Sequence, residues 1–191
     1  MLGVAQQAEG ARLGLMDAQQ LALAADQFDL VFLAFMLFHL PDPVAGLSET
    51  RRVLRAGGSA GLITWGESPD SVWDLIWTEE LDACGASPDE RDPTVAQHKL
   101  MDSPDKLSAL LREAGLTPER VWWGELAHQW TVPDMLALHD GCGTPSRRLA
   151  TLSPAERAAC RKRVELRLRE MPPDQLVERS RLVFAIARRS I

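Results

Sequence analysis

The clearest pattern in this chain is an apolar segment over residues 28–37, which begins at Phe28 and ends at Leu37. Its centre, residues 30–35, is apolar without any alternation. Such a run is typical of a strand that is buried on both faces, as in a parallel sheet flanked by helices. Residues 59–65 form a second run of the same kind. The sequence therefore predicts two buried strands.

A helix is predicted between these two strands. Asp42 suits the N-cap position, and Pro43 suits the first helical position. Val44 and Leu47 then follow at helical spacing, and Gly57-Gly58 is expected to end the helix in left-handed backbone. Strand, helix and strand with short connections predict a β-α-β unit, and hence an α/β fold with a parallel sheet.

The remaining elements follow from the same signals of periodicity, capping and turns. A short strand over residues 11–16 is expected to end at an acidic turn. Helices are predicted over residues 71–84, 103–114, 133–139 and 153–171, strands over 119–126 and 181–187, and loops over 85–102 and 141–145.

Composition narrows the class of protein. The 191 residues, of which 46% are hydrophobic, suit one globular domain covering 1–191. The net charge of −6 argues against a nucleic-acid-binding surface. The longest apolar run is too short to span a membrane, and no signal peptide is apparent. Three widely spaced cysteines indicate reduced thiols in a cytoplasmic protein, and the spacing of His and Cys predicts no metal site.

Four short motifs stand in a characteristic order: Met-Asp-Ala-Gln at 16–19, Phe-Asp-Leu-Val at 28–31, Phe-His-Leu-Pro-Asp-Pro at 38–43 and Arg-Arg-Val-Leu-Arg-Ala-Gly-Gly at 51–58. This series resembles the class I S-adenosylmethionine-dependent methyltransferases, particularly the small-molecule group that includes the quinone-biosynthesis enzymes. The resemblance is close over residues 1–66 and looser over 103–191. It implies a Rossmann-like sheet in which 1–66 is a partial cofactor-binding part. Residues 67–191 would then supply substrate-side helices, added before the last strand, and closing strands.

The resemblance also implies roles for single residues. Asp17 and Ala18 would hold the adenine of S-adenosylmethionine, while Ala34 and Phe35 would line its sulfonium. His39 would face the substrate and orient it or take a proton. The alternative for Asp17 is a turn aspartate that caps a following helix, and the alternative for His39 is a structural histidine that bonds the turn backbone.

One motif of the family is missing from the sequence given. Gly3, Gly10 and Gly14 do not have the Gly-x-Gly-x-Gly spacing that follows the first strand in the family. We therefore expect an amino-terminally truncated methyltransferase sheet. In the strand order 3-2-1-4-5-7-6 that the resemblance implies, the strand at residues 28–37 would become an exposed edge, which invites pairing with another chain.

Three explanations are open for this gap. The start of the gene is misassigned or the segment has been lost, or a partner chain supplies the strands. In the third explanation the chain pairs with itself as a homodimer, or repairs the sheet internally, and does something other than catalysis. The functions expected are methyl transfer to a small-molecule substrate or, as an alternative, a non-catalytic methyltransferase-like subunit that pairs with a partner chain. A plain α/β domain with an unrelated ligand would explain the periodicity but not the ordered motifs.

Overall fold

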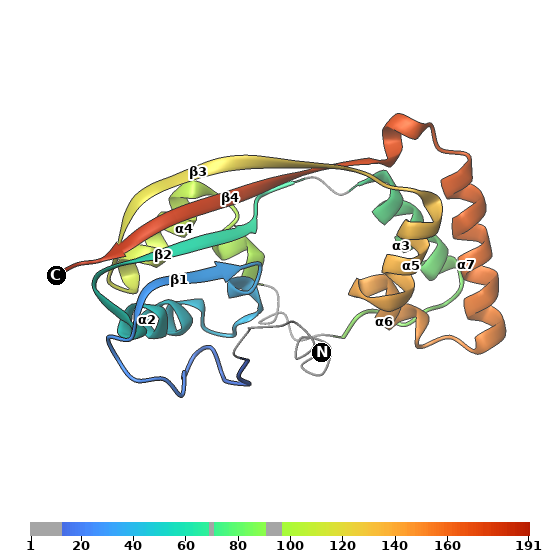
Figure 1. Ribbon diagram of the computed structural model, residues 1–191. Helices are drawn as coiled ribbons and strands as arrows, with labels where there is room; N and C mark the ends of the chain where they lie inside the picture. The colour runs from blue at the N-terminus through green and yellow to red at the C-terminus, as the bar shows by residue number, and fades with distance from the viewer. Residues whose placement is uncertain (1–12, 69–70, 91–96) are drawn as a thin grey trace. The chain divides into compact units, whose positions relative to one another are not determined.

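The computed structural model describes residues 13–68, 71–90 and 97–191. These residues form two compact units (Figure 1). The first unit contains the described residues within 1–66, 93–124 and 182–191, and the second contains those within 67–92 and 125–181. Each unit is built from segments that are far apart in the sequence.

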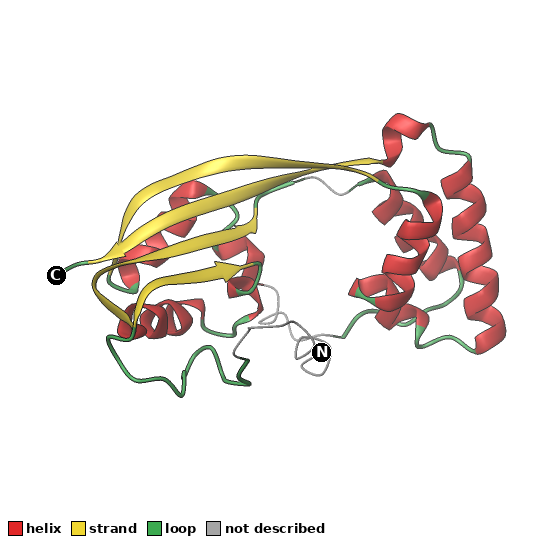
Figure 2. Ribbon diagram, viewed as in Figure 1, coloured by secondary structure: helices red, strands yellow, loops and turns green. Residues whose placement is uncertain are grey.

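The sheet has four strands: β1 (Phe28–Ala34), β2 (Leu54–Trp65), β3 (Leu116–Gln129) and β4 (Val177–Arg189). Their order is β1-β2-β4-β3, with β1 parallel to β2 and β4 antiparallel to β2 (Figure 2). This is the order 4-5-7-6 expected for the last four strands of a Rossmann-like methyltransferase sheet. The α/β prediction is therefore confirmed, and β1 is an edge strand of the described sheet.

Two helices of the first unit, α2 (Pro43–Val53) and α4 (Pro104–Glu113), pack on the sheet together with the short 3-10 turn η1 (Leu37–His39). A second 3-10 turn, η3 (Gln97–Leu100), contacts η1 and α4. Asp42 is the N-cap of α2 as predicted, and its Oδ1 accepts a hydrogen bond from the Ala45 N–H at 3.0 Å. The core forms where alternate residues of the strands meet these helices. It includes Leu47, Leu54, Leu62, Leu107, Leu111 and Val183.

Three details of the first unit differ from the sequence predictions. The helix α2 ends at Val53 rather than at Gly57-Gly58, because Leu54 pairs with Phe28 and takes residues 54–58 into β2. Gly57 still supplies left-handed backbone, with φ of 76°, where the register between β1 and β2 shifts. The strand β1 ends at Ala34, and η1 follows it.

The strand predicted at residues 11–16 is wrong over its described part. Residues 13–16 pair with no strand of the described sheet, and Leu15 has 85% of its surface exposed. A segment forms a β-strand only where a neighbouring strand accepts and donates its backbone hydrogen bonds, and residues 13–16 have no such neighbour among the described residues. Positions 11 and 12 lie outside the described residues.

The second unit contains the helices α3 (Val72–Ala83), α5 (Val132–Gly141), α6 (Gly143–Leu149) and α7 (Pro154–Arg169), and the 3-10 turn η4 (Pro173–Leu176). The predicted capping box of Ser153 and Glu156 opens α7. The loop predicted at 141–145 is wrong, since α6 begins at Gly143. A separate apolar core joins the helices, with Trp77, Leu81, Met135, Val164 and Leu168 at its centre. Within the described parts of the chain, no helix is long and apolar enough to cross a membrane.

Candidate functional site

The predicted adenine-binding residues lie on a tight turn ahead of β1. The Asp17 carboxylate accepts a hydrogen bond from the backbone N–H of Gln19 at 2.8 Å, and the Asp17 carbonyl accepts one from Gln20 at 3.1 Å. Asp17 is exposed and Ala18 is half-buried. The carboxylate therefore has a structural role as a turn aspartate and also remains open to solvent.

Polar side chains of α2 hold this turn in place. Glu49 accepts a hydrogen bond from the Leu21 N–H at 2.7 Å, and Arg52 donates to the carbonyls of Leu21 and Leu23 at 3.0 and 2.7 Å. The hydrogen bond from Arg52 also holds the pKa of Glu49 below its usual range. Gln19 accepts from the N–H of Asp42 at 2.7 Å. These bonds fix a segment that has no strand partner of its own.

The end of β1 carries an unusual backbone conformation. Phe35 has φ of 50°, in the left-handed region that residues other than glycine rarely adopt. Its N–H donates to the Ile63 carbonyl at 2.9 Å, and its ring centre lies 4.7 Å from that of Trp65. Backbone strain of this kind is concentrated at functional sites. The preceding residue, Ala34, is exposed.

A hollow of about 280 Å³ lies between the turn, β1, η1 and α2 in the first unit. Its walls are almost wholly apolar. Thr50 is the lining residue with a polar side chain, and its hydroxyl already donates a hydrogen bond to the Gly46 carbonyl at 3.0 Å. The lining residues are Ala18, Leu21, Val31, Phe32, Leu33, Met36, Leu37, Leu40, Gly46 and Thr50.

Of the five predicted site residues, only Ala18 lines this hollow. Asp17 precedes Ala18 in the chain. Ala34 and Phe35 lie in sequence between Leu33 and Met36, which both line the hollow. The structure thus brings the turn and the end of β1 to the same hollow. It does not show the Asp17 carboxylate pointing into it.

His39 is the last residue of η1 and is exposed. Its ring centre lies 4.3 Å from that of Phe38, and Phe38 in turn stacks with His98 at 4.0 Å. The backbone N–H of His39 donates to the Met36 carbonyl at 3.0 Å. The imidazole is therefore positioned by an aromatic contact and stays open to solvent.

Gly46 is a site residue that the sequence patterns did not single out. A side chain there would collide with Leu40, and the missing Cβ lets α2 approach η1 and the turn at Ala18. A glycine inside a helix costs about 1 kcal/mol relative to alanine, so its presence in α2 was a usable signal of close packing.

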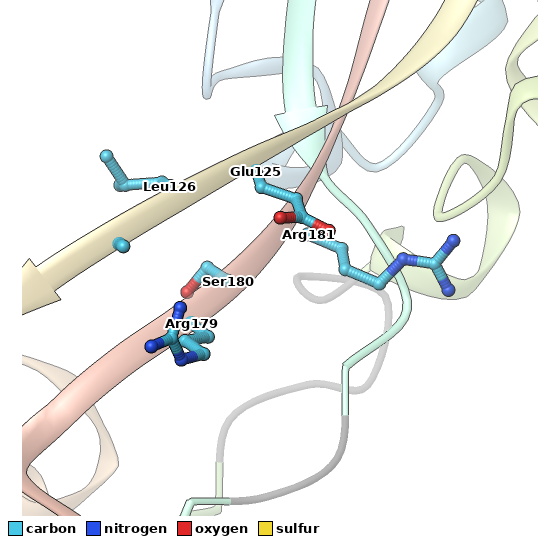
Figure 3. A pocket seen from close by; sticks show the side chains of 6 residues that line it. Glu125, Leu126, Arg179, Ser180 and Arg181 are labelled. Atoms are coloured by element: carbon cyan, nitrogen blue, oxygen red, sulfur yellow. The ribbon is translucent and has the colours of Figure 1, made fainter. Parts of the chain in front are cut away.

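Two further hollows lie in the second unit and are weaker candidates. Figure 3 shows one, of about 90 Å³, which is lined by Glu125 and Leu126 of β3 and by Arg179, Ser180 and Arg181 of β4. It has about a third of the volume of the hollow beside Ala18 and is far below the usual size of a ligand pocket, so it is too small for a cofactor. The other measures about 310 Å³ and is lined mainly by polar and charged residues. Its Arg147 already forms an ion pair with Asp89 at 2.9 Å, so this hollow lacks the largely apolar walls that suit an adenine ring.

The hollow beside Ala18 fits part of an adenosyl ligand. Its apolar walls suit the face of a purine ring, and the adjacent Asp17 carboxylate could accept hydrogen bonds at the ring's edge. No charged side chain lines the hollow among the described residues, so the zwitterionic methionyl end of S-adenosylmethionine has no partner there. The residues present therefore fit the adenosine part and not the amino-acid part.

Comparison with known proteins adds a family context. Residues 1–62 match the family described as "Methyltransferase domain". The chain is 29% identical over 145 residues to demethylmenaquinone methyltransferase of Beutenbergia cavernae, a match that covers 71% of this chain and 55% of that protein. It is 29% identical over 122 residues to the ubiquinone biosynthesis O-methyltransferase of a Ruegeria species, covering 61% and 47%. The chain thus spans about half the length of these relatives.

Solved structures share the fold. A S-adenosylmethionine-dependent methyltransferase of Methanosarcina mazei superposes with a TM-score of 0.52 at 14% identity, covering 99% of this chain and 76% of that one. A methyltransferase-like protein of Bacillus halodurans superposes with a TM-score of 0.50 at 16% identity, covering 92% and 76%. At such identities the likeness establishes the fold alone.

Proposed function

We propose that this chain is a class I methyltransferase domain that binds S-adenosylmethionine and takes part in methyl transfer to a small-molecule acceptor. The observation that carries the proposal is the apolar hollow between the Asp17–Ala18 turn and the end of β1. In open α/β sheets, ligands bind beyond the carboxyl ends of the parallel strands, and β1 ends at this place.

Each predicted residue has a role in this proposal. The Asp17 carboxylate accepts hydrogen bonds from the adenine amino group, and the Ala18 backbone N–H meets a ring nitrogen. Ala34 and Phe35 line the sulfonium, and the strained backbone of Phe35 fixes the end of β1 beside it. The cofactor supplies an electrophilic methyl group when bound. The residues of the chain bind it, orient it and exclude water from it.

His39 is the proposed residue on the acceptor side. Its imidazole is exposed and is held against Phe38, so it can orient an acceptor or take a proton from it. General acid–base groups typically contribute about 10²–10⁴ in rate. A proton-taking role predicts a large fall in kcat for His39→Gln. A purely orienting role predicts a change mainly in KM.

The names of the two curated relatives suggest which acceptors to test first. One is named for methylation of demethylmenaquinone, and the other is named as an O-methyltransferase of ubiquinone biosynthesis. Hydroxylated aromatic rings are therefore the first compounds to screen. A cytoplasmic location is also part of the proposal. It is supported by free thiols at all three cysteines, because thiols stay reduced in that compartment.

A second candidate function is favoured by the exposed edge of β1. Leu30 and Phe32 have 64% and 58% of their surface exposed on this edge strand. Exposed apolar edge strands are templates for pairing with another chain. The alternative is thus a methyltransferase-like subunit that pairs through β1 with a second copy or with a partner chain and does not catalyse on its own.

Calorimetric titration of the chain with S-adenosylhomocysteine tests the first candidate. A charged hydrogen bond is worth about 1.5–3 kcal/mol, so Asp17→Ala is expected to weaken binding by about tenfold to a hundredfold. Asp29→Ala is the matched control, because Asp29 is an exposed carboxylate of the same unit that pairs with Arg55. An equal loss in both variants, or no binding by a chain that is folded by circular dichroism, would contradict cofactor binding by this chain alone.

A further inference from the structure

Two cysteines of the second unit lie together where α3 meets α7, and the proposed function does not use them. Cys84 caps the carboxyl end of α3 and is half-buried, while Cys160 lies within α7 and is fully buried. Cys84 packs against the apolar cluster that contains Cys160, and its sulfur contacts Arg163, which lies one turn from Cys160 on the same helix. Figure 1 shows α3 and α7 side by side.

The guanidinium of Arg163 contacts the sulfur of Cys84, the more accessible of the two cysteines. Arg163 follows Cys160 by one helical turn on α7, and its Nη2 donates a hydrogen bond to the Cys84 sulfur. Its Nε donates to Glu80 at 2.7 Å, which fixes the guanidinium in that position. Guanidinium hydrogen bonds are stronger to an anionic sulfur than to a neutral one, and the thiolate is the reactive form of cysteine.

The second thiol has the opposite environment. Burial and the neighbouring Cys84 raise the pKa of Cys160 to about 12, so its sulfur stays protonated. One member of the pair is therefore open to solvent beside a cation, and the other is a buried neutral thiol next to it. Redox-sensing cysteines are solvent-accessible and often lie next to a second, resolving cysteine.

We propose that Cys84 and Cys160 are a peroxide-sensitive thiol pair that closes to a disulfide joining α3 to α7. The Cys84 thiolate attacks hydrogen peroxide, so that an S–O bond forms and the O–O bond breaks. The leaving hydroxide takes a proton and becomes water. The Cys160 sulfur then attacks the sulfenic acid, an S–S bond forms as the S–O bond breaks, and the Cys160 proton leaves with the hydroxyl as a second water.

Cys142 provides an internal comparison. It is the exposed cysteine of the chain and lies in the same unit, between α5 and α6. If exposure alone governed oxidation, Cys142 would react first. If the Arg163 contact and the neighbouring thiol govern it, Cys84 and Cys160 react first and end in the same disulfide.

The test uses the full chain, reduced and then treated with hydrogen peroxide, with peptide mapping under non-reducing conditions. We expect loss of two hydrogens and a cross-link between the peptides of Cys84 and Cys160, in the native chain and in Cys142→Ser alike. In Cys160→Ala we expect a dimedone adduct at Cys84. Arg163→Met is expected to slow closure by about tenfold, the factor that corresponds to losing one hydrogen bond to a charged group.

Two results would overturn the proposal. One is oxidation of Cys142 while Cys84 and Cys160 stay reduced in a chain that is folded by circular dichroism. The other is the absence of the Cys84–Cys160 cross-link at any peroxide dose that modifies the protein. Closure of Arg163→Met at the native rate would remove the role assigned to the guanidinium.

Discussion

Replacing Leu30 and Phe32 together by threonine tests whether the edge of β1 is an interface. These residues have 64% and 58% of their surface exposed on the edge strand of the described sheet. Threonine keeps a high preference for strands, so the substitution changes apolar area more than strand formation. The expected effect is therefore on association and not on folding.

The magnitude follows from the exposed area. Burying a whole leucine or phenylalanine side chain contributes about 1.5–3 kcal/mol. With roughly 60% of each residue still exposed, a partner that covers both gains about 2–4 kcal/mol. Since every 1.4 kcal/mol is a factor of ten, the loss from one chain weakens association by about 30-fold to several hundred-fold, and a symmetric dimer, in which both copies carry the substitutions, should weaken further.

Sedimentation equilibrium over a wide range of protein concentrations measures this effect. The matched control is Leu166→Thr, because Leu166 is 54% exposed on α7 in the second unit. We expect the native chain and Leu166→Thr to associate alike and the double variant to dissociate. A native chain that stays monomeric throughout, or an unchanged dissociation constant in the double variant, would refute the reasoning.

Two further changes have expected outcomes that follow from single contacts. Asp42→Ala removes the N-cap of α2, so thermal or urea unfolding should show a loss of about 1 kcal/mol, whereas the exposed Asp29→Ala should cost less. Hydrogen bonds from Arg163 and Arg167 hold the pKa of Glu80 below its usual range. The stability that this carboxylate contributes is therefore complete above the ordinary glutamate pKa and is lost as the pH falls through the lowered folded value. Urea unfolding at about pH 6 and about pH 3.5 should show a smaller acid loss in Glu80→Gln than in the native chain, and equal losses would contradict the assignment.

Local signals in the sequence predicted much of the first unit. The apolar runs at β1 and β2, with Asp42 and Pro43 between them, were enough for a parallel β-α-β unit. The order of the four strands came from the resemblance to a family, because pairing between distant strands leaves no local pattern. The end of α2 was misjudged because pairing of Leu54 with Phe28 outweighed the glycine signal at Gly57.

Other features depend on tertiary contacts that no short pattern contains. The helix α6 has no side-chain N-cap bond and begins at a glycine, so its sequence reads as a loop. Arg148 of this helix is buried and donates to the carbonyls of Ala86 and Ser87 at 3.0 and 3.1 Å, which holds α6 in place. The hollow beside Ala18 likewise arises from four segments, and only Ala18 among its lining residues was predicted.

Methyl-resolved nuclear magnetic resonance with S-adenosylhomocysteine tests the central claim most directly, because the walls of the hollow are rich in methyl groups. The account predicts that the methyl signals of Ala18, Val31 and Leu37 shift on titration, while those of Leu149 and Val164 in the core of the second unit do not. Unchanged signals at the hollow, or shifts confined to the second unit, would contradict cofactor binding at this site.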